Sequence, residues 1–195
     1  MEAAMTDIID KLQADLSEGR FLHSLGVAET ARDLALRFGC DPEKAYLAGL
    51  LHDCATKYSN TEMLALALSE GLCDRDAVID NPTAEFHAPL GAVVAKNEFG
   101  ITDGEILNAI ALHQTGDVPM TRLEIIVGLA DAIEPSRKAD KINAIREIAK
   151  TDLTRAYLEK CKLYMTNIIS AGNPLDPKRV EVYNYILTLK QGFKP

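Results

Sequence analysis

Tryptophan is absent from the 195-residue sequence, and phenylalanine and tyrosine are scarce, with aromatic residues at only 6%. The hydrophobic share of 47% is ordinary for a soluble globular protein, so the core must consist of leucine, isoleucine, valine and alanine. Basic residues are also too few to outweigh acidic ones, and the formal net charge is −8. Proteins that coat nucleic acid usually carry a basic surface, so we expect no nucleic-acid partner. A small anionic substrate stays compatible, because a local metal site can outweigh the net charge.

Cysteine is rare and lacks metal-binding spacing. The four cysteines, Cys40, Cys54, Cys73 and Cys161, include no C-x-x-C pair, which predicts reduced side chains in the core or in loops. The longest apolar run, Ile125 to Ile133, contains a charged residue and is too short to span a bilayer. The N-terminus lacks the basic region and apolar run of a signal peptide. We therefore predict a cytoplasmic protein with no membrane partner.

Strand signals are almost absent, whereas apolar residues recur at helical spacing through nearly the whole chain. Glycine and proline mark many of the expected helix ends. Asp41-Pro42-Glu43 is typical of a helix start, and Thr102-Asp103-Gly104-Glu105 fits a capping box. These signals predict the all-α class. The predicted helices cover residues 6–17, 21–38, 41–54, 61–71, 88–98, 106–113, 121–133, 139–171 as one helix or two, and 177–190.

Every histidine lies in or beside a predicted helix. With two aspartates they follow the order His23, His52-Asp53, His87, His113, Asp131. A single histidine is more often an ordinary core or surface residue than a ligand, and Asp131 in its apolar helix needs either a cationic partner, a helix end or a metal. Imidazole and carboxylate together suit zinc, iron and manganese, and a helical bundle can gather such side chains in its core. The combined pattern favours a metal site.

These residues resemble the HD-domain phosphohydrolase superfamily over about residues 18–137. The resemblance rests on Arg20-Phe21-Leu22-His23-Ser24, on the segment from Gly49 to Lys57 with His52-Asp53-x-x-x-Lys57, and on His87, His113 and Asp131. Finer details are similar to one branch, the symmetrical bis(5′-nucleosyl)-tetraphosphatases. They are Arg20-Phe21-x-His23-Ser24, His113-x-Thr115-Gly116 and Asp131-x-x-Glu134-Pro135-x-Arg137. The Gly-Tyr-Pro signature of the branch that cleaves cyclic dinucleotides is missing.

The resemblance implies one HD-type helical-bundle domain over residues 1–195, with a motif-bearing core at about 18–137 and C-terminal helices in 138–195. It also implies a divalent metal, iron with manganese or cobalt as substitutes, bound as one or two ions. His87 and His113 either complete a second ion site or contact phosphate. The ligands of the first ion would be His23, His52, Asp53 and Asp131.

The implied activity is hydrolysis of diadenosine tetraphosphate to two ADP, with a metal that supplies hydroxide from water near neutral pH. The catalytic residues would be Asp53, Lys57, His87 and His113. The substrate-binding residues would be Arg20, His23, Asp53, Lys57, His87, His113, Thr115, Asp131 and Arg137. Arg20, Lys57 and Arg137 could instead be ordinary exposed charges. Thr115 and Glu134 could orient ligands, or Glu134 could simply pair with Arg137.

Two other functions stay open at this point: an HD-type phosphatase or phosphodiesterase acting on another nucleotide, and a non-catalytic nucleotide-binding regulator. A small nucleotide is the expected partner in all three cases, and the sequence leaves open whether the protein is a monomer or a homodimer. The turn at 172–177 either closes over the nucleotide or only connects two helices.

Overall fold

The computed structural model describes residues 2–73 and 86–189, and every regular element within these ranges is helical. This confirms the predicted all-α class. No helix in these ranges has the length and apolar character needed to cross a membrane. The elements are α1 (Glu2–Asp15), α2 (Glu18–Phe38), α3 (Pro42–Leu51), the 3₁₀ helix η1 (Cys54–Lys57), α4 (Asn60–Ser69), α6 (His87–Phe99), α7 (Gly104–Leu112), α8 (Arg122–Ile133), α9 (Asp140–Ala149), α10 (Leu153–Ser170) and α11 (Pro177–Thr188).

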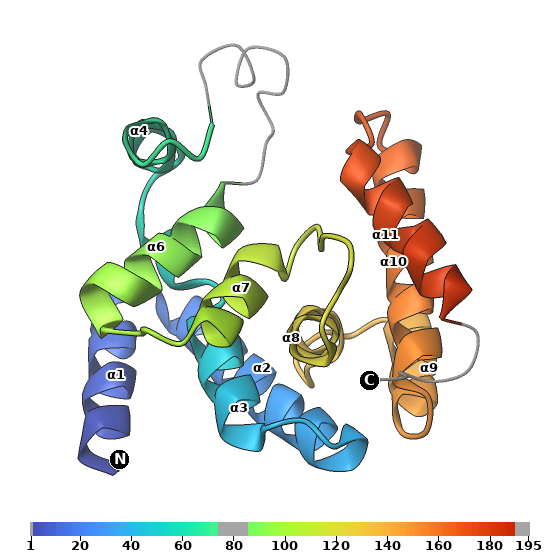
Figure 1. Ribbon diagram of the computed structural model, residues 1–195, viewed down its shortest axis with the longest axis horizontal. Coiled ribbons are helices and arrows are strands. Elements are labelled where there is room, and N and C mark those ends of the chain that lie inside the picture. Colours follow the sequence, from blue (N-terminus) through green and yellow to red (C-terminus); the bar gives the residue numbers. More distant parts are fainter. Residues whose placement is uncertain (1, 74–85, 190–195) are drawn as a thin grey trace.

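Helix α8 is the central element of the fold. Figure 1 shows it end-on, with α2, α3 and α7 on one side and α9, α10 and α11 on the other. It packs against α2, α3, α7, α9 and α10, and every residue from Leu123 to Ile133 is buried. A helix that is apolar on all sides must be enclosed in this way. Asp131 is thereby carried into the middle of the molecule.

The helix starts follow capping chemistry, with one predicted start corrected. Asp41 caps α3 as predicted, accepting hydrogen bonds from the N–H groups of Glu43 and Lys44 at 2.9 and 3.1 Å. The prediction of a capping box at Thr102 was wrong. Asp103 caps α7 instead, since its carboxylate accepts hydrogen bonds from the N–H groups of Glu105 at 2.8 Å and Ile106 at 3.4 Å.

Two predicted helix ends also need correction. The helix predicted to run to Cys54 ends at Leu51, because the ring of the next residue, His52, bonds to the Gly49 carbonyl oxygen that a further helical turn would use. The helix predicted over 139–171 is divided, with Asp152 capping α10. The last helix ends at Thr188, and residue 190 of its predicted span lies outside the described residues.

Two glycines let neighbouring helices approach closely beside the histidines. A Cβ atom on Gly49 of α3 would lie 3.0 Å from the Ala28 Cα of α2. A Cβ atom on Gly128 of α8 would lie 2.8 Å from the carbonyl oxygen of His113. Only glycine tolerates such contacts without a shift of backbone. The two glycines therefore bring α2, α3, α8 and the end of α7 together around one point.

Candidate metal centre

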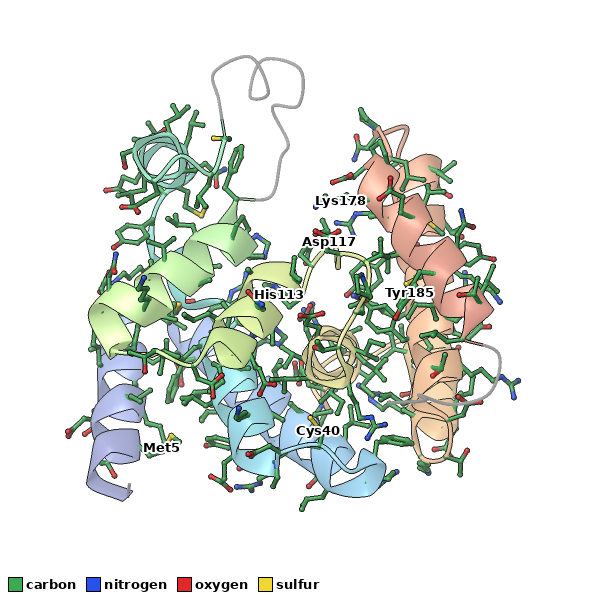
Figure 2. All side chains as sticks on the ribbon, viewed as in Figure 1. Met5, Cys40, His113, Asp117, Lys178 and Tyr185 are labelled. Carbon is green, nitrogen blue, oxygen red and sulfur yellow. The ribbon has the colours of Figure 1, made fainter. Side chains whose placement is uncertain are left out.

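Two histidines are positioned identically, each one residue beyond the end of a helix. The Nδ1 atom of His52 lies 2.7 Å from the Gly49 carbonyl oxygen, and that of His113 lies 2.8 Å from the Ile110 carbonyl oxygen. A carbonyl oxygen can only accept, so each Nδ1 must carry the hydrogen. In its neutral form, each ring therefore has its lone pair on Nε2. Both rings therefore present a ligand atom toward the interior, where Figure 2 shows His113 among the central helices.

His23 on α2 is held between two carboxylates of the α8 end. Its Nδ1 atom lies 3.0 Å from Glu134 Oε1, and its Nε2 atom lies 3.1 Å from Asp131 Oδ1. A carboxylate behind a histidine fixes the ring orientation and raises its basicity, as is common for metal-binding histidines. Glu134 therefore orients the His23 ring, which was one of its two predicted roles.

The side chains converge in two overlapping groups that share His52. Ligand atoms of His23, His52 and Asp131 lie within 4.8 Å of one another, and so do those of His52, Asp53 and His113. All five of these residues are buried. The sequence order His, His-Asp, His, His, Asp thus corresponds to one cluster in space.

His87 extends this cluster toward α6. Its Nε2 atom lies 3.3 Å from His113 Nε2 and 3.7 Å from Asp53 Oδ1, and its side chain keeps 20% exposure. It is therefore the most accessible imidazole of the four, since the side chain of His23 is 10% exposed and those of the other two lie deeper. This position suits both predicted roles, a ligand of a second ion and a phosphate contact.

The charges of the cluster match a cation. Burial alone would raise the pKa of the Asp53 carboxyl, but the nearby His52 ring and Arg20 guanidinium hold it well below its usual range. Burial would likewise raise the pKa of Asp131, but a hydrogen bond with His23 outweighs it and keeps that carboxyl ionised. Burial, reinforced by His52, lowers the pKa of His113 to about 3, so that ring is neutral at physiological pH.

An orphaned nitrogen shows that these residues fit a metal. The Nε2 atom of His52 is fully buried and is one of two such side-chain atoms in the described residues without a hydrogen bond, although Asp53 Oδ2 lies 3.3 Å away. Leaving a buried polar atom unsatisfied is costly. An ion coordinated by neutral imidazole nitrogen and ionised carboxylate oxygen would satisfy it, and this donor set suits a divalent metal.

Two arginines lie at the edge of the cluster. Arg20 Nη1 donates to Asp53 Oδ2 at 2.6 Å, and Arg137 Nη2 donates to Asp131 Oδ1 at 2.9 Å. Their side chains are 44% and 40% exposed, so each guanidinium reaches from a buried carboxylate toward solvent. Arg137 also approaches Glu134 at 3.8 Å, so the predicted Glu134–Arg137 pair is present as well.

Lys57 and Thr115 are not brought into the histidine cluster by any contact that we observe. The Lys57 ammonium donates to Asp15 at 3.0 Å and to Glu98 at 2.6 Å, which ties η1 to α1 and α6. Contact with a phosphate would require Lys57 to leave these carboxylates. Thr115 lies two residues beyond His113 and lines a recess against α10 and α11.

Three residues that support the cluster carry little signal in the sequence. Gly49 and Gly128 permit the close helix contacts, but a glycine inside a helical pattern carries no partner information. Lys160 is buried on α10 and donates to the carbonyl oxygen of His113 at 3.4 Å. A lysine on an otherwise apolar helix face was the only available signal.

The chain belongs to the HD-domain family. The family model matches residues 20–136, a range that contains all four histidines, Asp53 and Asp131. Members of this family are metal-dependent hydrolases, in keeping with a cluster that could hold a divalent ion.

Individual relatives narrow this class. The chain is 34% identical over 177 residues to the symmetrical bis(5′-nucleosyl)-tetraphosphatase of Bacillus subtilis (strain 168), covering 91% of this chain and 94% of the relative. It is 38% identical over 172 residues to the protein of the same name from Halalkalibacterium halodurans, covering 88% and 91%. A crystal structure from Clostridium acetobutylicum, described as a predicted HD superfamily hydrolase involved in NAD metabolism, matches with a TM-score of 0.88 and 37% identity over 94% of this chain and 97% of that one.

Proposed function

We propose that this protein hydrolyses bis(5′-nucleosyl) tetraphosphates symmetrically, converting diadenosine tetraphosphate into two ADP. The observation that carries the proposal is the buried cluster of histidines and aspartates flanked by two exposed arginines. The full-length similarity to symmetrical bis(5′-nucleosyl)-tetraphosphatases supports the choice of substrate. We treat residues 1–195 as one HD-type domain, since α8 packs against both the motif-bearing helices and α9 and α10.

In this proposal His23, His52, Asp53 and Asp131 hold the first divalent ion. A divalent ion held there would supply a nucleophile from water near neutral pH and would offset charge on phosphoryl oxygens. His113 is held neutral with its lone pair directed inward, and His87 at the accessible edge binds a second ion or a phosphate oxygen.

The two arginines would orient the phosphate chain. Each already donates to a buried carboxylate, so its guanidinium plane is fixed and its outer edge faces solvent. Arginine forms paired hydrogen bonds to phosphate oxygens in this way. If Arg20 and Arg137 clamp one ADP unit, they would hold its β-phosphate at the cluster of histidines and aspartates, and attack of water there would expel the other ADP. We also propose that Thr115 and Lys57 contact the substrate. Lys57 would in addition be a catalytic residue.

Iron is the native ion that we propose, with manganese or cobalt as substitutes, because the resemblance to the symmetrical bis(5′-nucleosyl)-tetraphosphatases implies it; the imidazole and carboxylate ligands are compatible with this choice. We also retain a cytoplasmic location and a homodimer as proposals. Metal analysis of protein purified without oxygen, together with its mass in solution, tests the ion and the oligomeric state.

The test of the activity is product analysis with metal-loaded enzyme. Diadenosine tetraphosphate should give only ADP, and water labelled with heavy oxygen should place the label on the β-phosphate of one ADP. An Asp131→Asn variant purified in the same way controls for a contaminating hydrolase and should be inactive. Substantial AMP plus ATP would contradict symmetric cleavage.

The two alternative functions give different outcomes in the same assay. A nucleotide phosphatase would release orthophosphate from mononucleotides. A non-catalytic regulator would bind the dinucleotide without turnover after loading with iron, manganese or cobalt.

A further inference from the structure

The C-terminal end of helix α8 is held by an arginine of the following helix. Arg146 lies in the last turn of α9 and is half-buried. Its Nε atom donates to the carbonyl oxygen of Ile133 at 2.6 Å. Its Nη2 atom donates to the carbonyl oxygens of Glu134 at 2.5 Å and Arg137 at 2.6 Å. One guanidinium group therefore spans the backbone of residues 133–137.

A proline explains why side chains must bond to this backbone. A helix leaves the carbonyl groups of its last turn without intrahelical partners, and Pro135 has no N–H group to donate to Asp131. The Nε atom of Arg137 donates to the Asp131 carbonyl oxygen instead, at 3.2 Å. Arg146 takes the carbonyl oxygen of Ile133, at the helix end where a positive charge is favourable. The two arginines thus replace the missing backbone donors.

The side chains of the same segment contact two candidate metal ligands. Glu134 Oε1 lies 3.0 Å from Nδ1 of His23, and Arg137 Nη2 donates to Asp131 Oδ1 at 2.9 Å. The backbone N–H of Arg137 donates to the carbonyl oxygen of Glu134 at 3.0 Å, which joins these two residues in one turn. Arg146 therefore fixes the backbone of both residues that support the ligands from this side.

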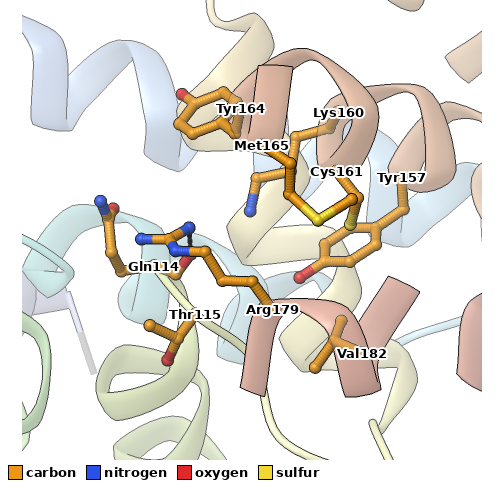
Figure 3. A pocket seen from close by; sticks show the side chains of 9 residues that line it. All are labelled: Gln114, Thr115, Tyr157, Lys160, Cys161, Tyr164, Met165, Arg179 and Val182. Atoms are coloured by element: carbon orange, nitrogen blue, oxygen red, sulfur yellow. Dashed lines mark hydrogen bonds between the residues drawn. The ribbon is translucent and has the colours of Figure 1, made fainter. Parts of the chain in front are cut away.

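The end of α7 receives a similar but simpler contact. Lys160 of α10 donates to the carbonyl oxygen of His113 at 3.4 Å, and Figure 3 shows its side chain directed toward the segment that carries Gln114 and Thr115. An ammonium group is a point charge, whereas a guanidinium group holds several acceptors in one fixed orientation. Because Arg146 bonds to three carbonyl groups, it restrains its segment more strongly than a single contact can.

We infer that Arg146 is a positioning residue, which acts on the metal centre through the backbone of Glu134 and Arg137. In this role it keeps the Glu134 carboxylate behind the His23 ring and directs the outer edge of the Arg137 guanidinium toward the substrate. The first part rests only on the candidate metal centre, and the second rests on the proposed function. The alternative is that Arg146 only caps α8 and contributes to stability alone.

The test compares Arg146→Met with Lys150→Met by competitive metal titration. Lys150 directly follows α9, and its side chain, 57% exposed, pairs with Glu147 at 2.6 Å. Each variant therefore loses one positive charge from the same end of α9. Calorimetry at saturating metal measures the Kd of ADP, and circular dichroism with Tm measures folding.

We expect Arg146→Met to raise the Kd of the metal by about 10-fold, the lower end of the usual effect of disturbed ligand support. The Kd of ADP should also rise by about 10-fold, because Arg137 would be misplaced. Lys150→Met should match the wild type. Arg146→Lys keeps the charge without the planar fork and should give intermediate values, and it takes over the test if Arg146→Met does not fold.

A double-mutant cycle with Glu134→Gln identifies the route of the effect. If Arg146 acts on His23 through the Glu134 carboxylate, its loss should matter less once that carboxylate is gone. Arg146→Met should then raise the Kd of the metal by only about 3-fold or less in the Glu134→Gln background, since residues that act through one contact are not additive.

Wild-type metal and ADP affinities in folded Arg146→Met or Arg146→Lys, with a lower Tm, would overturn the inference in favour of the capping role. The same effect of Arg146→Met in both backgrounds would also overturn it, because Arg146 would then act by another route. Weakened metal binding with unchanged ADP affinity would overturn the part assigned to Arg137. If Arg146→Met weakens metal binding but the wild type does not cleave diadenosine tetraphosphate, the proposed function fails while the positioning role stands.

Discussion

Replacing Gly128 with alanine perturbs the metal centre without altering any ligand. The added Cβ atom would lie 2.8 Å from the His113 carbonyl oxygen, whereas ordinary contacts begin at 3.4 Å. The end of α7 and helix α8 must therefore separate by about 0.6 Å, the difference between these two distances. Because Asp131 lies on α8 and His113 follows α7, the two halves of the cluster move apart by the same amount.

The magnitude of the effect follows from this separation. Metal–ligand distances in real sites stay within about 0.2 Å of their usual values, so a separation of this size exceeds the normal range. We therefore expect Gly128→Ala to weaken metal affinity by about 10- to 100-fold, as disturbed ligand support usually does. Overpacking costs about 1–3 kcal/mol, and the better helix propensity of alanine offsets about 1 kcal/mol, so the net loss of stability is about 0–2 kcal/mol.

The assay is competitive metal titration, with activity measured at saturating metal. Gly104→Ala is the matched control, since a Cβ atom there has no neighbour within 4 Å and the residue lies at the start of α7. Wild-type metal affinity in Gly128→Ala would refute the idea that this close helix contact sets the ligand geometry.

Three further predictions concern single residues. His52→Ala should remove most bound metal and abolish hydrolysis, because the site loses the ligand shared by both groups; full metal content would contradict the assignment. Glu134→Gln should lower metal affinity about 10- to 100-fold, because the His23 ring loses its charged partner; titration against the wild type measures this. Burial alone would raise the pKa of Glu98, but hydrogen bonds led by the one from Lys57 lower it from 4.5 to about 2. The ionised Glu98 therefore stabilises the folded state above pH 4.5, and this contribution is lost as the pH falls toward 2. Glu98→Gln should remove it and lower the unfolding free energy above pH 4.5 by about 1–3 kcal/mol. Identical pH profiles of stability for the two proteins would exclude this role.

Much of the secondary structure was readable from local chemistry. Helical periodicity, the Asp41-Pro42 start and glycines such as Gly39 and Gly100 depend on neighbouring residues along the chain, and the corresponding helix ends agree with the structure. The errors at Thr102 and Cys54 arose where two capping groups competed or where a side chain took over a backbone hydrogen bond. Helical periodicity does not reveal which of two competing groups makes the hydrogen bond at a helix end.

The candidate ligands were also accessible from the sequence, because histidines and an aspartate in apolar helical segments need a common partner. Their convergence on one site was implied by the family resemblance, but its physical cause was not readable from the sequence, since it depends on α2, α3, α7 and α8 meeting at Gly49 and Gly128. Only the tertiary structure shows that Lys57 donates to Asp15 and Glu98, and that Lys160 donates to the carbonyl oxygen of His113. Residue types and spacing set which chemistry is available, whereas long-range helix packing decides which charged groups share one site. The physical reason is that a side chain's partner is chosen by distances that no local sequence pattern contains.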